Sequence, residues 1–386
     1  MKRTTLLLVL AAEVAFAQRD DPAILVMQGK YREAEPLLVR ELEAQRQATG
    51  LEDPSLTGSI GALAALYRAQ GRDAEALRLL KYSLSIRERS LGKNSLDLIP
   101  DLRLLAGVLT AVGQNAQAEM AFLRVIAVRE KAKGPNDLDL AGDCTELAAF
   151  YIERKRYAVA EPNLGRAMGI VEARLGTSAQ ALVPMLDALV RTHLDQGNHG
   201  EAEPLLLREI SILERTYGPS HEKIAAYLDR LAMVCFRQRR YADAEILYER
   251  SLRIWEAVLG PSEPALATML DNLAVAYALQ EKFGLAEPLY RRSLGLRERA
   301  VVESLNNRAL ALERGGDRSE AERLYRQAME LAERIPVIDG PANVGEKEAL
   351  ATTLSNYAAF LRGSERDAEA AKLEARARAL SQPGSR

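Results

Sequence analysis

The hydrophobic and polar positions of this 386-residue chain repeat together every 42 residues. Alanine marks each period, and positions within a copy are numbered from it; the seven strictly spaced alanines are Ala34, Ala76, Ala118, Ala160, Ala202, Ala244 and Ala286. Apolar or small residues recur at positions −16, −12 and −9, which lie on one face of an α-helix. A polar turn follows, and a second apolar series runs from the alanine through +3 or +4 to +8. Each copy is therefore predicted to be a pair of helices.

Glycine and proline predict where the second helix of a copy begins and ends. Glycine stands at +16 in six copies, where a left-handed residue can end the helix. Proline stands at +2 in four copies and would be costly deep inside a helix, so the second helix should begin near Tyr31 or Tyr157 in those copies. Small residues at −12 and at zero indicate a close helix crossing. Glutamate recurs at +12 and is interpreted as a structural row that pairs with Arg or Lys of adjacent turns.

The period breaks near the C-terminus. Ala321 follows Ala286 by 35 residues and Ala370 follows Ala321 by 49, so one link is shortened and the next is lengthened. The short link holds no glycine or proline, which predicts either a tight turn near residues 300–303 or a fusion of two helices. The extra residues of the long link are predicted to form a surface loop at 335–346.

The two ends of the array also differ from its middle. Only a short apolar piece, residues 23–28, precedes the second helix of the first copy, so that copy should keep half of its first helix. In the last copy Glu374 and Arg378 occupy the usually apolar +4 and +8 positions, which suits a terminal cap. The predicted organisation is an array over residues 18–380, of about nine copies, followed by a disordered tail at 381–386.

A fixed period of this length is typical of a solenoid, in which each copy buries its apolar face against its neighbours. The segment GPSEPALATMLDNLAVAYALQEKFG (260–284), continued by LAEPLYRRSLGLRER, resembles the 42-residue tetratricopeptide repeat of the kinesin light chain type. This resemblance implies an all-α fold, a tetratricopeptide-repeat solenoid wound as a right-handed superhelix. HEAT repeats are the alternative, disfavoured by the small residues at −12 and zero; WD40 blades would need more aromatic residues and no helical stripes.

The first residues are typical of an export signal. Lys2 and Arg3 precede a leucine-rich apolar run, and Ala15-Phe16-Ala17 matches a cleavage site that would leave Gln18 as the first mature residue. The apolar run is shorter than the roughly 20 residues of a spanning helix, so an uncleaved membrane anchor is the lesser alternative. We therefore expect residues 1–17 to be a signal peptide and the protein to be exported, either periplasmic or secreted.

Charge and motifs argue against several functions. The formal net charge is −2 with both signs interspersed, whereas nucleic-acid binding needs a concentrated basic face. The chain has no HExxH, GxSxG, P-loop or paired CxxC pattern, and its three histidines are interpreted as structural. We expect no catalytic residue, metal, cofactor or small-molecule substrate. Cys144 and Cys235 are predicted to be buried free thiols.

The candidate binding residues lie on the first helices, which by the family resemblance line a concave groove. Position −15 carries an acidic row, Asp187, Asp229 and Asp271, which would select positive charge. Position −14 carries Arg230 and then an asparagine row that would hold a peptide backbone, namely Asn272, Asn307 and Asn356. Arg191 lies four residues after Asp187 and could simply pair with it on a solvated helix face.

These observations predict a scaffold that binds a protein or peptide partner through the groove. Two alternatives from other classes are kept. One is an architectural element that spaces or assembles an envelope complex through its convex side or its ends. The other, disfavoured by the missing motifs, is an enzyme with an unrecognised site. Fold resemblance by itself does not decide among them.

Overall fold

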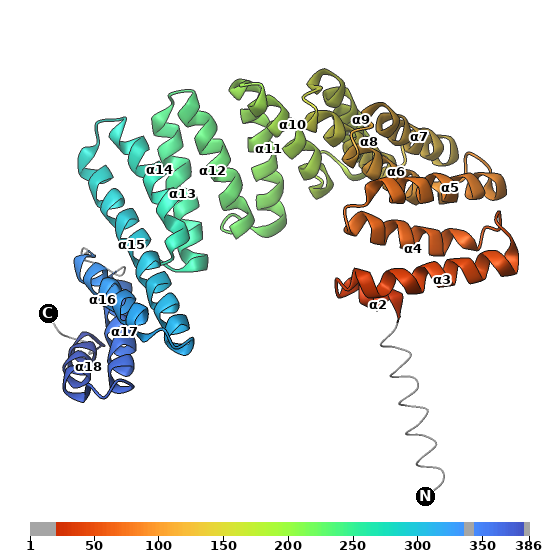
Figure 1. The fold of residues 1–386 in the computed structure, drawn as a ribbon. Coiled ribbons are helices and arrows are strands. Elements are labelled where there is room, and N and C mark those ends of the chain that lie inside the picture. The colour runs from red at the N-terminus through yellow and green to blue at the C-terminus, as the bar shows by residue number, and fades with distance from the viewer. Residues whose placement is uncertain (1–20, 336–342, 382–386) are drawn as a thin grey trace, which may run out of the picture. The chain divides into compact units, whose positions relative to one another are not determined.

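The computed structural model describes residues 21–335 and 343–381, and every regular element within them is a helix (Figure 1). The helices α2 to α18 form nine successive pairs in this part of the chain, with the long α15 belonging to two of them. The prediction of an all-helical array of stacked helix pairs is confirmed. The chain divides into two compact units, Met1–Ala188 and Leu189–Arg386.

In the first unit the helices from α2 to α9 pack against one another in chain order. The short α2 supplies the truncated first helix that the sequence predicts, and the pairs that follow are complete. The helices are α2 (Pro22–Met27), α3 (Tyr31–Thr49), α4 (Leu56–Ala69), α5 (Asp73–Leu91), α6 (Ile99–Ala111), α7 (Asn115–Lys133), α8 (Leu138–Glu153) and α9 (Tyr157–Leu175), and α10 (Val183–Asp195) crosses the boundary between the units.

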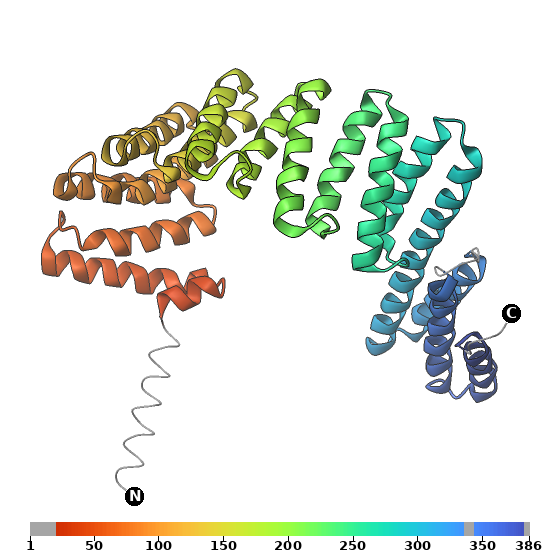
Figure 2. The ribbon, with the colours of Figure 1, turned by 180° about the vertical axis from the view of Figure 1, so that it is seen from behind.

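The second unit continues the same arrangement, and α11 to α15 lie side by side in both views (Figures 1 and 2). Its helices are α11 (His199–Tyr217), α12 (Glu222–Arg237), α13 (Tyr241–Leu259), α14 (Ala267–Ala278), α15 (Phe283–Arg314), α16 (Arg318–Arg334), α17 (Asn343–Arg362) and α18 (Asp367–Ser381). The last pair, α17 and α18, packs closely on itself and ends the array.

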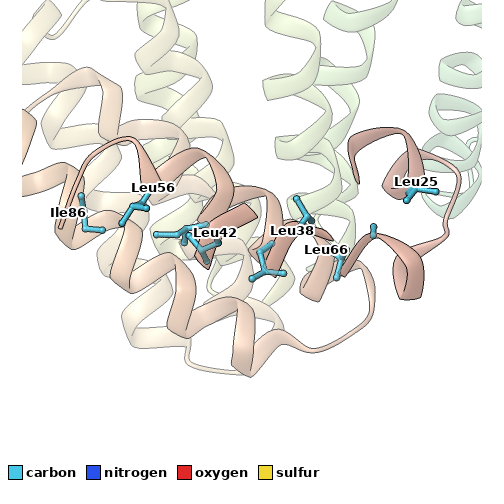
Figure 3. Close-up of a cluster of buried hydrophobic side chains, with 9 residues drawn as sticks. Leu25, Leu38, Leu42, Leu56, Leu66 and Ile86 are labelled. Carbon is cyan, nitrogen blue, oxygen red and sulfur yellow. The ribbon is translucent and has the colours of Figure 1, made fainter. Parts of the chain in front are cut away.

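The periodic alanines are among the most deeply buried positions of the fold. Six of the seven are fully buried, and the seventh, Ala286, is only 3% exposed. The small residues at −12, such as Ala106 and Ala274, are equally enclosed. Larger side chains fill the space around these crossings, as the cluster of leucines contributed by α2, α3 and α4 shows (Figure 3). The prediction of close helix crossings at these two positions is therefore confirmed.

The second helices begin and end in a uniform way. α3 and α9 begin at Tyr31 and Tyr157 as predicted, and the six complete second helices from α3 to α13 each have 19 residues. The glycine at +16 follows each of them with φ between +80° and +92° and ψ between 153° and 170°. This is the extended positive-φ region, which is essentially restricted to glycine, and not the left-handed helical cap that we expected.

The structure decides between the two alternatives for the short link. α15 is a single helix of 32 residues, so the second helix of the seventh copy and the first helix of the eighth are fused. The predicted loop at 335–346 is too long at its C-terminal end because α17 already begins at Asn343. Residues 336–342, the predicted signal peptide at 1–17 and residues 382–386 of the predicted tail lie outside the described residues.

The glutamate row at +12 forms ion pairs between neighbouring copies. Each described partner is the arginine at +6 of the following copy, so our expectation of pairing with adjacent turns was wrong. The two residues are 36 positions apart in four of these pairs and 43 apart in the pair of Glu333 with Arg376. In the second unit Arg250 lies 2.5 Å from Glu214, and Arg292 lies 2.5 Å from Glu256. The same arginine also donates to the carbonyl after the capping glycine, as Arg292 does to Pro261 at 2.7 Å. We call this series of contacts the arginine ladder.

A second series of ion pairs runs along the start of the second helices. The glutamate directly after the periodic alanine accepts from a basic residue at −4 of the next copy. Arg240 lies 2.7 Å from Glu203, and Lys282 lies 2.6 Å from Glu245. Between the last two copies, a hydrogen bond from Arg366, together with those from Arg326 and Tyr357, lowers the pKa of Glu322 to about 2. The acidic residue that follows the alanine in the sequence pattern thus has a structural role in holding adjacent copies in register.

The arginine ladder should contribute measurably to stability. We expect Arg292→Ala to lower the free energy of unfolding by about 1–2 kcal/mol, because it leaves Glu256 and the Pro261 carbonyl without their charged donor. Denaturant unfolding followed by circular dichroism measures this loss. The matched control is Arg291→Ala, which removes an exposed pair with Glu287 within one helix and should change stability little. Equal effects of the two substitutions would contradict the role of the ladder.

Candidate functional site

The predicted asparagine row lies on three successive first-helix segments of the second unit. Asn272 is on α14, Asn307 is on the second half of α15, and Asn356 is on α17. Asn307 is exposed, and the other two are half-buried. None of the three side-chain amides makes a hydrogen bond to any residue that the structure describes. All three therefore retain both a donor and an acceptor for a partner.

The predicted acidic row differs from the asparagine row, because its members in the second unit contact the second helix of their own copy. Asp271 forms an ion pair with Arg297 of α15. Asp229 is half-buried, and burial raises the pKa of its carboxyl, while Ser251 and Trp255 of α13 partly oppose this change. The geometry of these two residues therefore favours a role in packing over selection of a positively charged partner.

The other candidate residues are placed as follows. Arg230 of α12 is half-buried, and its guanidinium lies 5.7 Å from the ring centroid of Tyr227. Asp187 and Arg191 are both on α10, the helix that crosses the boundary between the units; Asp187 is half-buried and Arg191 is exposed. Their role in binding stays a prediction.

One polar cluster of the first helices was missed by the sequence analysis. Asp143 of α8 is fully buried and accepts from two arginines, Arg103 of α6 and Arg129 of α7. Arg103 lies 2.5 Å from Asp143, and the same arginine also pairs with Glu146 at 3.1 Å. The sequence carries a signal for this cluster: Asp143 stands at position −17 of its copy, and Arg129 stands 14 residues earlier at position +11 of the preceding copy. Arg87 and Asp101 have the same positions one copy earlier and also form an ion pair. All the charges of this cluster are paired, so it links adjacent copies and leaves no unpaired charge for a ligand.

The described residues offer little for metal binding or membrane insertion. No group of three or more His, Cys, Asp or Glu side chains there could hold a metal ion. No helix in the same residues is long and apolar enough to cross a membrane. Cys144 and Cys235 are buried free cysteines, as predicted, and burial raises the pKa of both thiols. His221 has a local role, since its Nδ1 accepts from the Lys223 N–H at the start of α12.

Stacked helix pairs with an asparagine row define this protein as a helical repeat scaffold. A family model described as tetratricopeptide repeat matches residues 55–131, 178–249 and 222–299, and a second model of the same description matches residues 301–335. The first model alone covers more than half of the chain, so the chain belongs to the tetratricopeptide repeat family. Scaffolds of this kind mediate protein–protein interaction, and the partners expected here are proteins or peptides.

Solved structures that are similar to this chain include kinesin light chain-like proteins. BtubC (BKLC) from P. vanneervenii is 18% identical with a TM-score of 0.46, covering 57% of this chain and 89% of its own. A putative kinesin light chain from Podosopora anserina is 23% identical with a TM-score of 0.46, covering 54% and 99%. A Rap protein complexed with competence and sporulation factor is 14% identical with a TM-score of 0.37, covering 96% and 98%. No curated protein matched the chain.

The different settings of the two aspartates lead to opposite expectations for their amide variants. Burial raises the pKa of Asp229 above its ordinary value of 3.8, so the ionised carboxylate at neutral pH opposes folding. We expect Asp229→Asn to raise the free energy of unfolding at pH 7. The gain should shrink as the pH falls towards 3.8, where the wild-type carboxyl takes up its proton in both states.

The matched control is Asp271→Asn at the same position of the next copy. It removes the partly exposed ion pair with Arg297 and should lower stability by less than about 1 kcal/mol. Thermal unfolding of both variants between pH 4 and pH 7 makes the comparison. A loss of stability in Asp229→Asn at neutral pH would contradict the structural explanation of its pKa.

Proposed function

We propose that the first-helix face of the second unit binds an extended peptide segment of a protein partner through the asparagine row. The observation that carries this proposal is that the Asn272, Asn307 and Asn356 amides stand in the same position of three successive copies and have no hydrogen-bond partner among the described residues. A peptide backbone presents alternating N–H and C=O groups, and a side-chain amide can bond to either. A row of amides therefore suits a backbone better than it suits a particular side chain.

The residues next to the asparagine row have a secondary role in this proposal. Asp271, which lies beside Asn272, is already paired with Arg297, and Asp229 is half-buried, so recognition of the peptide backbone is central to the proposal and selection of positive charge is secondary. The protein acts as a binding scaffold without an activity of its own. An architectural role through the ends of the array is the second candidate, and in that case substitutions on the first-helix face would leave assembly unchanged.

The proposal is tested by replacing the three asparagines together. Peptides are first selected from a random display library on the purified chain, and their dissociation constants are measured by calorimetry. We expect Asn272→Ala, Asn307→Ala and Asn356→Ala combined to weaken binding by more than about tenfold, since each lost hydrogen bond is worth about 0.5–1.5 kcal/mol. The melting temperature should stay unchanged because none of the three amides makes a hydrogen bond within the described residues.

A matched control tests the surface itself. Gln327→Ala removes an exposed amide from α16, a second helix of the same unit, and should leave peptide binding intact. Unchanged affinity in the triple variant, with peptides that still compete with one another, would place the binding site elsewhere on the chain.

We also propose that the protein is exported and that residues 1–17 are removed, leaving Gln18 first. The support is the sequence pattern of a positive start, an apolar run and Ala15-Phe16-Ala17. N-terminal sequencing of the chain recovered outside the cytosol should begin at Gln18. An Ala17→Leu substitution should block that cleavage and retain the longer form. Recovery of the intact chain, starting at Met1, from the cytosol alone would contradict export.

A further inference from the structure

The fused helix α15 forms one wall of a cavity in the second unit. The cavity has a volume of about 440 Å³ and lies between three segments: the loop that follows α13, the middle of α15, and the N-terminal part of α17. Its volume falls within the range of roughly 300–1,000 Å³ that is typical of ligand pockets. It is separate from the asparagine row, since the cavity-lining Asn306 is buried whereas its neighbour Asn307 is exposed.

The cavity exists because the short link replaces a loop by a helix. In the preceding copies the second helix ends at the glycine of position +16, and residues near its end are exposed, as Arg89 and Arg215 are at +13. In α15 the helix continues, and the arginine of the same position, Arg299, is only 5% exposed. The break in the sequence period thus creates an environment that no other described copy provides.

Arg299 is a buried charge without a counterion among the described residues. Its Nη1 donates to the Ser262 carbonyl at 3.0 Å, and its Nε is buried with no hydrogen-bond partner. No carboxylate of the described residues forms an ion pair with it. A buried charge without a partner is costly, and an anion that entered the cavity would remove that cost. The guanidinium matches the planar geometry of a carboxylate.

Asn306 offers the opposite kind of group, an unpaired acceptor. It is 6% exposed, and its Nδ2 donates to the Thr353 hydroxyl at 2.7 Å. Because the Thr353 hydroxyl itself donates to the Ala349 carbonyl at 2.8 Å, it can only accept from Asn306. This fixes the orientation of the amide and leaves Oδ1 buried with no donor. A ligand that satisfies the cavity must therefore carry a hydrogen-bond donor as well as an anionic group.

The charge at the edge of the cavity identifies the donor. Three exposed glutamates line it, Glu263, Glu303 and Glu348, and none forms an ion pair with a described residue. Their negative charge favours a cationic donor over a neutral one. Arg299 and Asn306 are seven residues apart on one helix, which corresponds to about 10 Å along its axis. A separation of this size suits a ligand whose two charged ends are several ångströms apart, as they are in a dipeptide.

We propose that this cavity binds a small zwitterion of dipeptide size, with its carboxylate on Arg299 and its ammonium group between Asn306 and the glutamates at the edge. The inference is independent of the peptide-binding face proposed above, because it uses other residues and a free rather than a protein-linked ligand. It assigns a ligand site to the break in the repeat period.

Dialanine is the probe that tests the proposal, with two blocked analogues as chemical controls. N-acetyl-dialanine lacks the ammonium group, and dialanine amide lacks the carboxylate. We expect dialanine to give saturable heat in calorimetry at millimolar concentration and to raise the melting temperature of the chain. Each analogue should bind at least about tenfold more weakly. Absence of dialanine binding, or equal binding of either analogue, would overturn the proposal.

Variants of the chain separate ligand binding from folding. Arg299→Gln should weaken dialanine binding at least about tenfold without lowering the melting temperature of the free protein, because it removes a buried charge that has no counterion. Glu348→Gln, at the exposed edge, should weaken binding of dialanine and of dialanine amide by a similar factor, because both ligands carry the ammonium group. Glu330→Gln, an exposed glutamate of α16, is the control and should have no effect. Unchanged dialanine affinity in Arg299→Gln would contradict the placement of the ligand carboxylate on Arg299.

Discussion

The rest of this structure depends on the close crossing of helices at two small residues per copy. The alanine at position zero and the small residue at −12 are buried almost completely, so no larger side chain fits there without moving the helices apart. Each copy can bury its apolar face only against its neighbours, and the crossing sets how closely those neighbours approach. This packing constraint explains why alanine recurs at a strict spacing in the sequence.

Polar contacts between copies then fix the register of each copy against the next, which apolar packing alone would not determine. The arginine ladder and the ion pairs at the start of the second helices both join one copy to the next, and both recur at fixed positions. A pair such as Arg250 and Glu214 is only partly exposed, and the additional bond from Arg250 to the Pro219 carbonyl gives it a defined geometry. These contacts use the acidic residues of the pattern for structure, which separates them from the asparagines that have no such partner.

Local patterns in the sequence predicted the helices well because helix periodicity, glycine and proline act over a few residues. The starts of α3 and α9 and the burial of the alanines follow from them. The partner of the +12 glutamate could not be predicted, because it lies 36 residues away on another copy. The setting of Asp229 against α13 and the burial of Arg299 likewise depend on how whole helices pack. Of the candidate site, the position of the asparagine row could be predicted, whereas the engagement of its acidic neighbours could not.

The fused helix α15 also has a consequence for how the array opens. In a solenoid whose copies are joined by loops, a terminal copy can fray while its neighbour stays folded, and stability is approximately a sum of local terms. The seventh and eighth copies share one continuous helix of 32 residues, so disrupting one disturbs the backbone hydrogen bonds of the other. The fusion therefore makes these two copies a single cooperative folding unit within a chain that is otherwise divisible copy by copy.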